Sequence, residues 1–123
     1  MARILVADDE LTITMVLEQV LADEGFDVVT AGDGKEALAV ASQLPAPDLI
    51  LVDLYMPEVN GKDFVSRLRA NAALKNVPVI VVTGAVSHER DYPSPGSYQM
   101  LISKPFDLED VVAQVKRLLA GPQ

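Results

Sequence analysis

The chain has 123 residues, of which half are hydrophobic and 23% are charged, so one globular domain with its own core is expected. The absence of cysteine excludes disulfide bonds and thiolate metal sites. The formal net charge of −8 argues against direct contact with nucleic acid, whose phosphates attract lysine and arginine, although solubility alone also explains an acidic chain. No apolar run approaches the ~18 residues that a membrane span needs. Acidic residues follow the first apolar run too soon for a secretory signal, so a cytoplasmic protein without membrane insertion is expected.

The first third of the chain alternates apolar runs with helical patterns. Residues 3–7 read as a strand, which the acidic residues 8–10 close. A helix that Gly25 ends is expected next, because apolar residues recur at its spacing. These residues are Ile13, Val16, Leu17, Val20 and Leu21. A strand is then expected at 26–30 and a short helix at 35–44. The inward face of that helix is expected to be Ala37, Val40, Ala41 and Leu44.

The same alternation continues to the end of the chain. Residues 48–53, with the sequence DLILVD, run through apolar residues into a carboxylate and read as a strand buried on both faces. Four further elements are expected: a helix at 62–71, a strand at 79–82, a short strand at 101–102 and a helix at 108–119.

Strands that alternate with helices predict right-handed βαβ units, and therefore an α/β fold with a doubly wound, five-stranded parallel sheet. One unit is irregular. Pro93, Pro95 and Gly96 oppose a long helix within residues 85–99. A short helical turn or a mobile loop is expected there, in place of a full fourth helix.

Polar residues stand where four of the five expected strands end: Asp8, Asp9, Asp53, Thr83 and Lys104. The carboxyl ends of parallel strands lie at one edge of a sheet, so these side chains should converge. Clustered carboxylates without imidazole or thiolate suit a hard cation, Mg²⁺ or Mn²⁺. A lysine and a hydroxyl suit a phosphoryl group. Asp53, kept anionic beside the cation, is then a candidate nucleophile toward phosphorus.

Each of these five residues also has a structural explanation. Asp8 and Asp9 alone would serve to cap the first helix, and Asp53 alone would be a turn residue. Thr83 alone would be a β-former, and Lys104 a solvated surface lysine. Their joint placement at strand ends favours the chemical interpretation.

In this order and at these spacings the residues resemble the receiver domain of response regulators, over essentially the whole chain. The matching motifs are Asp8-Asp9, Asp53 in DLILVDLYMP, Gly61, Thr83-Gly84 and Lys104-Pro105-Phe106. The resemblance implies a flavodoxin-like strand order, 2-1-3-4-5. A single receiver domain over residues 1–123 is expected, and the lack of an output domain would be a departure from the family: another protein would detect the phosphorylation, or the domain would serve as a phosphate relay or sink.

The resemblance implies a role for each site residue. Asp53 would accept a phosphoryl group from a histidine kinase or a histidine phosphotransfer protein. Mg²⁺, or Mn²⁺, would bind to Asp8, Asp9, Asp53 and the main-chain carbonyl of Tyr55. Thr83 would hydrogen-bond the phosphoryl oxygen and Lys104 would pair with it, with the Lys104–Pro105 peptide bond cis.

The family's switch region corresponds to Thr83, Gly84, Leu101 and Pro105. Leu101 departs from the family, because an aromatic residue that moves with the threonine usually stands there. The irregular segment is a second departure, since the fourth helix often serves for dimerisation or output. Signalling through another face, or by ordering of this segment, is therefore expected.

A phospho-accepting response regulator of a two-component phosphorelay is the leading interpretation, with phosphorylation altering interactions with an unknown downstream protein. Such a protein is not a turnover enzyme. The alternative is a receiver-like interaction module that phosphorylation no longer switches. A phosphatase with an aspartyl nucleophile is disfavoured, because Leu54 and Tyr55 offer no second acid to protonate a leaving group. The bulky Tyr55 is expected to shield an acyl phosphate from water.

Overall fold

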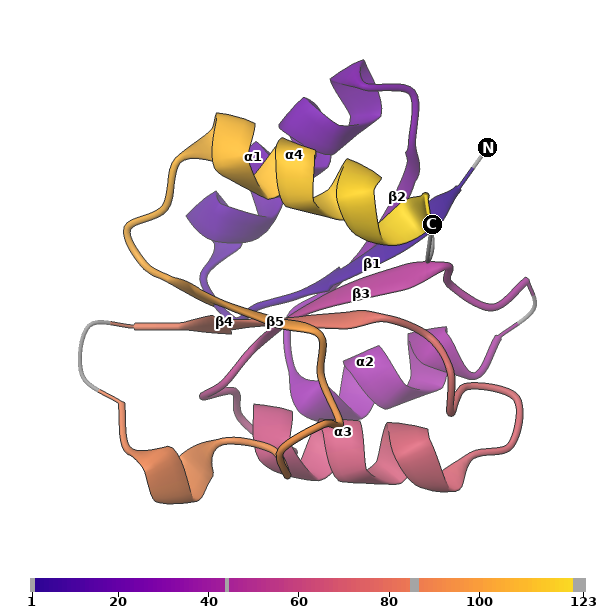
Figure 1. Cartoon of the computed structure of the whole chain (residues 1–123), viewed down its shortest axis with the longest axis vertical. Coiled ribbons are helices and arrows are strands. Elements are labelled where there is room, and N and C mark those ends of the chain that lie inside the picture. Colours follow the sequence, from indigo (N-terminus) through magenta and orange to yellow (C-terminus); the bar gives the residue numbers. More distant parts are fainter. Residues whose placement is uncertain (1, 44, 85–86, 121–123) are drawn as a thin grey trace.

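The computed structural model describes residues 2–43, 45–84 and 87–120. It contains a five-stranded sheet in the order β2-β1-β3-β4-β5, in which every neighbouring pair is parallel (Figure 1). The strands are β1 (Arg3–Ala7), β2 (Asp27–Ala31), β3 (Leu49–Asp53), β4 (Val79–Thr83) and β5 (Met100–Ser103). The helices are α1 (Leu11–Asp23), α2 (Gly34–Ala41), α3 (Gly61–Ala70), the 3₁₀ helix η1 (Glu89–Asp91) and α4 (Leu108–Leu119). The predicted α/β fold and strand order are confirmed.

The sheet separates two apolar cores. Helices α1 and α4 cover one face, α2 and α3 cover the other, and η1 lies on the α3 side (Figure 1). Successive residues of a strand point to opposite faces, so Ile4 and Val6 join the α1/α4 core whereas Leu5 and Ala7 join the α2/α3 core. The central strands β3 and β4 are buried at every position. Their continuous apolar sequences are what a parallel sheet covered on both faces requires.

Side-chain caps fix where three of the helices begin. Asp33, Asn60 and Asp107 each accept a hydrogen bond from a main-chain N–H of the first turn of α2, α3 and α4. At α1 the N-cap residue is Glu10, whose own N–H donates to Asp8 Oδ1 at 2.8 Å. The side chain of Asp8 thus contacts the residue at the N-cap but caps no N–H of α1, contrary to the capping explanation, and it also lies in the carboxylate cluster described below.

Several predicted boundaries and orientations are wrong. Helix α2 ends at Ala41 rather than at residue 44, and Leu44 lies outside the described residues. Val16 was assigned to the apolar stripe of α1, yet its side chain is 45% exposed. Strand β5 begins one residue earlier than predicted, at Met100. Within the described ranges no helix has both the length and the apolar character to cross a membrane.

The irregular unit contains one helical turn. Its described part, residues 87–99, includes only η1, and the segment continues through Pro93 and Pro95 into β5. The predicted short helical turn is confirmed. A proline ring fixes φ and leaves the residue without a main-chain N–H donor, so a helix cannot continue through Pro93 or Pro95. Residues 85 and 86 of the predicted segment lie outside the described residues.

Gly61 allows α3 to begin directly against the end of β3. Its N–H donates to the carbonyl oxygen of Leu54 at 2.8 Å. A Cβ at this position would lie 2.6 Å from the carbonyl oxygen of Asp53 and 2.9 Å from Leu54 Cα. The contacted atoms are main chain and cannot rotate away, so the close approach requires glycine.

We expect Gly61→Ala to lower the free energy of unfolding by about 1–3 kcal/mol, because the added methyl overpacks the backbone beside Asp53. Gly32→Ala is the matched control. A Cβ there meets no atom within 4 Å, so a change within about 0.5 kcal/mol is expected. Urea unfolding of the three proteins measures both values, and equal stabilities for the two variants would contradict the steric account.

Candidate functional site at the carboxyl edge of the sheet

Four strand ends bring the site residues to one edge of the sheet. Asp8 follows β1 directly, Asp53 is the last residue of β3, Thr83 is the last of β4, and Lys104 follows β5. The register aligns Ala7 with Val52 and Asp53 with Val82, so neighbouring strands end at nearly the same level. The main-chain N–H of Lys104 donates to the Thr83 carbonyl at 2.7 Å and extends this alignment beyond β5.

Three carboxylates converge at this edge. Asp8, Asp9 and Asp53 each offer one oxygen atom, and these oxygens all lie within 4.8 Å of one another. Asp8 and Asp53 are buried, being 3% and 6% exposed, while Asp9 is exposed to solvent. The donor set is entirely carboxylate oxygen and open on one side, which fits a hard divalent cation that keeps part of its water shell.

Lys104 supplies the positive charge of the site. Its Nζ lies 3.0 Å from Asp8 Oδ2, 3.7 Å from Asp53 Oδ2 and 2.8 Å from Glu10 Oε1, and the side chain is only 15% exposed. One ammonium cannot neutralise three carboxylates, so the cluster retains a negative charge. Glu10 was not among the predicted site residues. Its place directly after the acidic pair Asp8-Asp9 could have indicated that it lies near the site.

The electrostatics disfavour an ionised Asp53 in the absence of a cation. Burial, and then the negative charge of Asp8, raise the pKa of Asp53 to about 7, against an opposing effect of Lys104. Burial also raises the pKa of Asp8. Burial lowers the pKa of Lys104, but its hydrogen bonds to Glu10 and Asp8 and the charge of Asp53 outweigh this effect, so that pKa is raised overall.

The side chain of Thr83 is 1% exposed and faces the segment that follows β4. Its hydroxyl is within hydrogen-bonding distance of the Gly84 carbonyl, at 2.8 Å, and of Ser87 Oγ, at 3.1 Å. Ser87 was not predicted as a site residue, because a serine in a polar segment carries no pattern that marks it. Thr83 therefore reaches the edge as predicted, with its donor directed to local acceptors.

Tyr55 links the loop after β3 to η1. Its side chain is 40% exposed, and its hydroxyl donates to Asp91 Oδ2 at 2.8 Å and accepts from the main-chain N–H of His88 at 3.3 Å. The hydrogen bond to Asp91 raises the pKa of Tyr55. Asp91 was not predicted to take part in the site. The hydrogen bond to Asp91 restrains the side chain of Tyr55, which stands two residues after Asp53 in the sequence.

The remaining predicted switch residues lie on or after β5. Leu101 is 38% exposed and pairs with Val81 across the sheet. The Lys104–Pro105 peptide bond is cis, as the resemblance implies. The side chain of Leu101 offers no hydrogen-bonding group, so β5 brings no polar partner to Thr83 at that position.

A family model described as the response regulator receiver domain matches residues 4–116. The chain belongs to this family. The DNA-binding response regulator MtrA of Mycolicibacterium paratuberculosis is 39% identical over an alignment of 124 positions, gaps included, that covers 95% of this chain and 51% of MtrA. This receiver spans about half the length of the curated relatives it matches.

Solved structures of receivers superpose closely on this one. The chemotaxis protein CheY4 of Vibrio cholerae is 32% identical, with a TM-score of 0.85 and coverage of 95% of this chain and 98% of CheY4. TrrA of Thermotoga maritima, solved as a complex with Mg²⁺ and BeF, is 33% identical, with a TM-score of 0.83 and coverage of 96% and 99%. The acidic cluster of this receiver thus has the composition to bind a metal, in a family with a magnesium-bound member.

The raised pKa of Asp53 predicts how stability depends on pH when divalent ions are removed. The unfolded chain releases this proton near pH 3.8, whereas the folded receiver holds it to about 7. The free energy of unfolding should therefore fall as pH rises from 4 to 7, by at most about 4 kcal/mol from this group. Urea unfolding in EDTA measures the fall. Asp53→Asn should flatten it, and an equal fall in that variant would assign the effect to other groups.

Proposed function

We propose that this receiver accepts a phosphoryl group on Asp53 from a histidine kinase or a histidine phosphotransfer protein, in a reaction that requires Mg²⁺ or Mn²⁺. The observation that carries the proposal is the convergence of three carboxylates and Lys104 around a buried Asp53. A purely structural aspartate has no need of two further acids within 4.8 Å, whose repulsion raises the free energy of the folded state.

The transfer forms an acyl phosphate. One carboxylate oxygen of Asp53 attacks phosphorus, the bond between phosphorus and the imidazole nitrogen of the donor breaks, and the electron pair of that bond returns to the imidazole. Attack requires the ionised carboxylate. A cation held by Asp8, Asp9 and Asp53 would lower the pKa of Asp53 from about 7 and offset the charge of the phosphoryl group.

Side chains and main-chain groups around Asp53 complete the site. Lys104, 3.7 Å from the carboxylate, would move onto a phosphoryl oxygen, because an ammonium pairs well with a phosphate as a point charge. The Thr83 hydroxyl would donate to another oxygen. The main-chain carbonyl of Tyr55 would be a fourth ligand of the cation, and no N–H of the described residues donates a hydrogen bond to that carbonyl.

Phosphorylation would act by changing contacts with another protein, through the switch region formed by Thr83, Gly84, Leu101 and Pro105.

The receiver is proposed to be cytoplasmic and to lack turnover on an external substrate. MtrA is a DNA-binding regulator, but the net charge of −8 opposes direct contact of this chain with nucleic acid. We propose that residues 1–123 form one receiver domain, which signals through contact with a downstream protein.

A second function has specific support. Leu101 lacks an aromatic ring, and between residues 87 and 99 the fourth unit contains only the three-residue η1. Both features would suit a receiver fold that serves as a constant interaction module and no longer responds to phosphorylation. The complete carboxylate and lysine cluster favours the first function, since an unswitched module would have no use for it.

Phosphorylation by a small-molecule donor separates the two functions. We expect incubation with acetyl phosphate and Mg²⁺ to add the mass of one phosphoryl group to the wild-type chain, and EDTA to prevent the gain. Asp53→Asn removes the nucleophile and should abolish it, while Asp48→Asn, at the opposite end of β3, is the matched control. Asp48 accepts a hydrogen bond from the N–H of Arg3, far along the strand from the cluster. An unmodified wild type, or a gain that persists in Asp53→Asn, would refute the proposal.

The ring of Tyr55 should slow hydrolysis of the acyl phosphate. Its hydroxyl is held by Asp91 and by the main-chain N–H of His88, and a ring two residues beyond Asp53 would limit the approach of water to phosphorus. We expect Tyr55→Ala to shorten the half-life of the phosphorylated receiver several-fold, as measured by intact mass after removal of the donor. Tyr55→Phe keeps the ring and should shorten it less. An unchanged half-life in Tyr55→Ala would exclude shielding.

A further inference from the structure

A chain of three hydroxyl groups runs from the site to η1. Thr83 Oγ1 lies 3.1 Å from Ser87 Oγ, and Ser87 Oγ lies 3.0 Å from the Tyr92 hydroxyl. Thr83 is buried, Ser87 and Tyr92 are half-buried, and Tyr92 packs against the α2/α3 core. The chain thus joins the last residue of β4 to the residue that follows η1.

Each hydroxyl of this chain has only one proton to donate. In the described state Thr83 has two acceptors within reach, the Gly84 carbonyl and Ser87. If Thr83 turns to donate to a phosphoryl group on Asp53, those contacts must break or reverse. Ser87 then loses the partner that fixes its own orientation, and so the arrangement at Tyr92 changes as well, because hydrogen bonds in a chain depend on one another.

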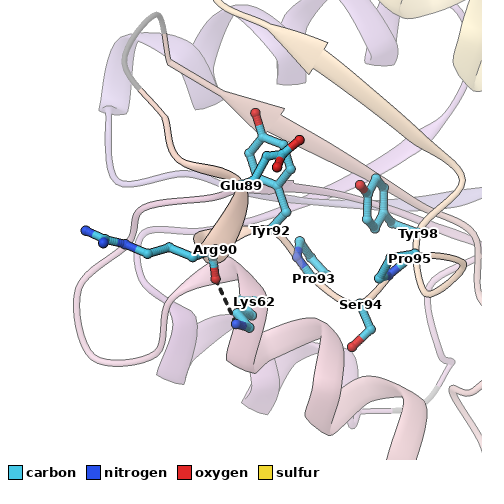
Figure 2. A pocket seen from close by; sticks show the side chains of 8 residues that line it. All are labelled: Lys62, Glu89, Arg90, Tyr92, Pro93, Ser94, Pro95 and Tyr98. Carbon is cyan, nitrogen blue, oxygen red and sulfur yellow. Dashed lines mark hydrogen bonds between the residues drawn. The ribbon is translucent and has the colours of Figure 1, made fainter.

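The η1 segment is tied to the site by a second route. The Tyr55 hydroxyl donates to Asp91 in η1. From the other side, Lys62 Nζ of α3 donates to the Arg90 carbonyl at 2.8 Å (Figure 2). Side-chain hydrogen bonds from two parts of the fold, the loop after β3 and helix α3, therefore position the three-residue helix, which has no buried residue of its own. Contacts of this kind exchange partners at low cost compared with repacking of a core.

Tyr92 also faces the surface. It lines a pocket of about 480 Å³ between η1 and α3, together with Pro93, Pro95, Tyr98 and Lys62 (Figure 2). A displacement of Tyr92 would alter the shape of this pocket. The hydroxyl chain is thus a physical connection from the edge of the sheet to an accessible part of the molecule.

We propose that Ser87 and Tyr92 are positioning residues for Thr83: they hold its hydroxyl in the phosphate-free orientation and transmit its movement to η1. This inference rests on the proposed phosphorylation of Asp53. It assigns the coupling to residues of the irregular segment, while the exposed Leu101 on β5 has no hydroxyl to contribute. The two departures from the family are then connected: the hydroxyl groups of Ser87 and Tyr92 in the fourth unit take the role of the aromatic residue that is missing at Leu101.

Affinity for beryllofluoride in excess Mg²⁺, measured by calorimetry, tests the coupling without catalysis. Ser87→Ala removes a contact that keeps Thr83 turned away, so we expect binding about two- to tenfold tighter than in the wild type. Ser87→Thr retains the hydroxyl and should restore the wild-type affinity. Tyr92→Phe removes one oxygen atom and should tighten binding in the same direction by a smaller factor.

The matched control is Tyr98→Phe. Tyr98 is also half-buried against the α2/α3 core and lines the same pocket, yet its hydroxyl makes no hydrogen bond within the described ranges. We expect no change in affinity for this variant. Since Tyr92 acts through Ser87, the double variant Ser87→Ala/Tyr92→Phe should match Ser87→Ala alone, which is a non-additive result for groups in one chain.

Nuclear magnetic resonance gives a readout that a general loss of stability would not produce. Beryllofluoride should shift the main-chain amide signals of residues 88–92 in the wild type, and Ser87→Ala should reduce those shifts while the shifts at Leu54 and Tyr55 persist. Additive affinities, or equal effects of Tyr92→Phe and Tyr98→Phe, would overturn the coupling alone. Failure of the wild type to bind beryllofluoride would overturn both the proposed phosphorylation and the coupling.

Discussion

Electrostatic repulsion among the carboxylates at the edge of the sheet is the constraint on which the rest of the structure depends. Asp8 and Asp53 stand at the ends of the adjacent strands β1 and β3, and both are buried, so their charges cannot be separated by solvent. Lys104 offsets part of the charge, and its N–H is fixed to the Thr83 carbonyl. Packing of the apolar strands thus offsets the repulsion among the carboxylates. A bound cation would reduce this repulsion and favour the ionised, nucleophilic form of Asp53.

The division between packed and hydrogen-bonded residues determines which parts can respond. β3 and β4 are buried along their whole length and interlock with both cores, so a shift of either strand would open cavities on two faces. The hydroxyl groups of Thr83, Ser87, Tyr92 and Tyr55, by contrast, each take part in only one or two hydrogen bonds. Each such bond contributes about 1 kcal/mol. Under the proposed phosphorylation of Asp53, these contacts would rearrange at lower cost than the packing of the sheet.

The sequence predicts the parts that follow from periodicity and strand order. Continuous apolar runs identify β3 and β4, and the parallel arrangement brings Asp8, Asp53 and Lys104 together without any knowledge of contacts. The roles of Glu10, Ser87 and Asp91 could not be predicted in this way, because they depend on which polar side chain meets which across loops of irregular geometry. Val16 was misassigned for a related reason: spacing alone does not show how much of the width of α1 the sheet covers.

The far end of the irregular segment explains why its response would stay local. Arg69 of α3 donates from Nε to the Ser97 carbonyl at 2.8 Å and from Nη1 to the Lys75 and Val77 carbonyls. Burial lowers the pKa of this guanidinium, which nevertheless remains charged and forms charge-assisted hydrogen bonds stronger than those between neutral groups. Gln99 makes two hydrogen bonds to Val79: its side-chain oxygen accepts from the N–H of Val79, and its own N–H donates to the Val79 carbonyl. Residues 97 and 99 are thereby anchored to α3 and β4, so the proposed displacement at Tyr92 would be confined to the pocket side of the segment and would not reach β5.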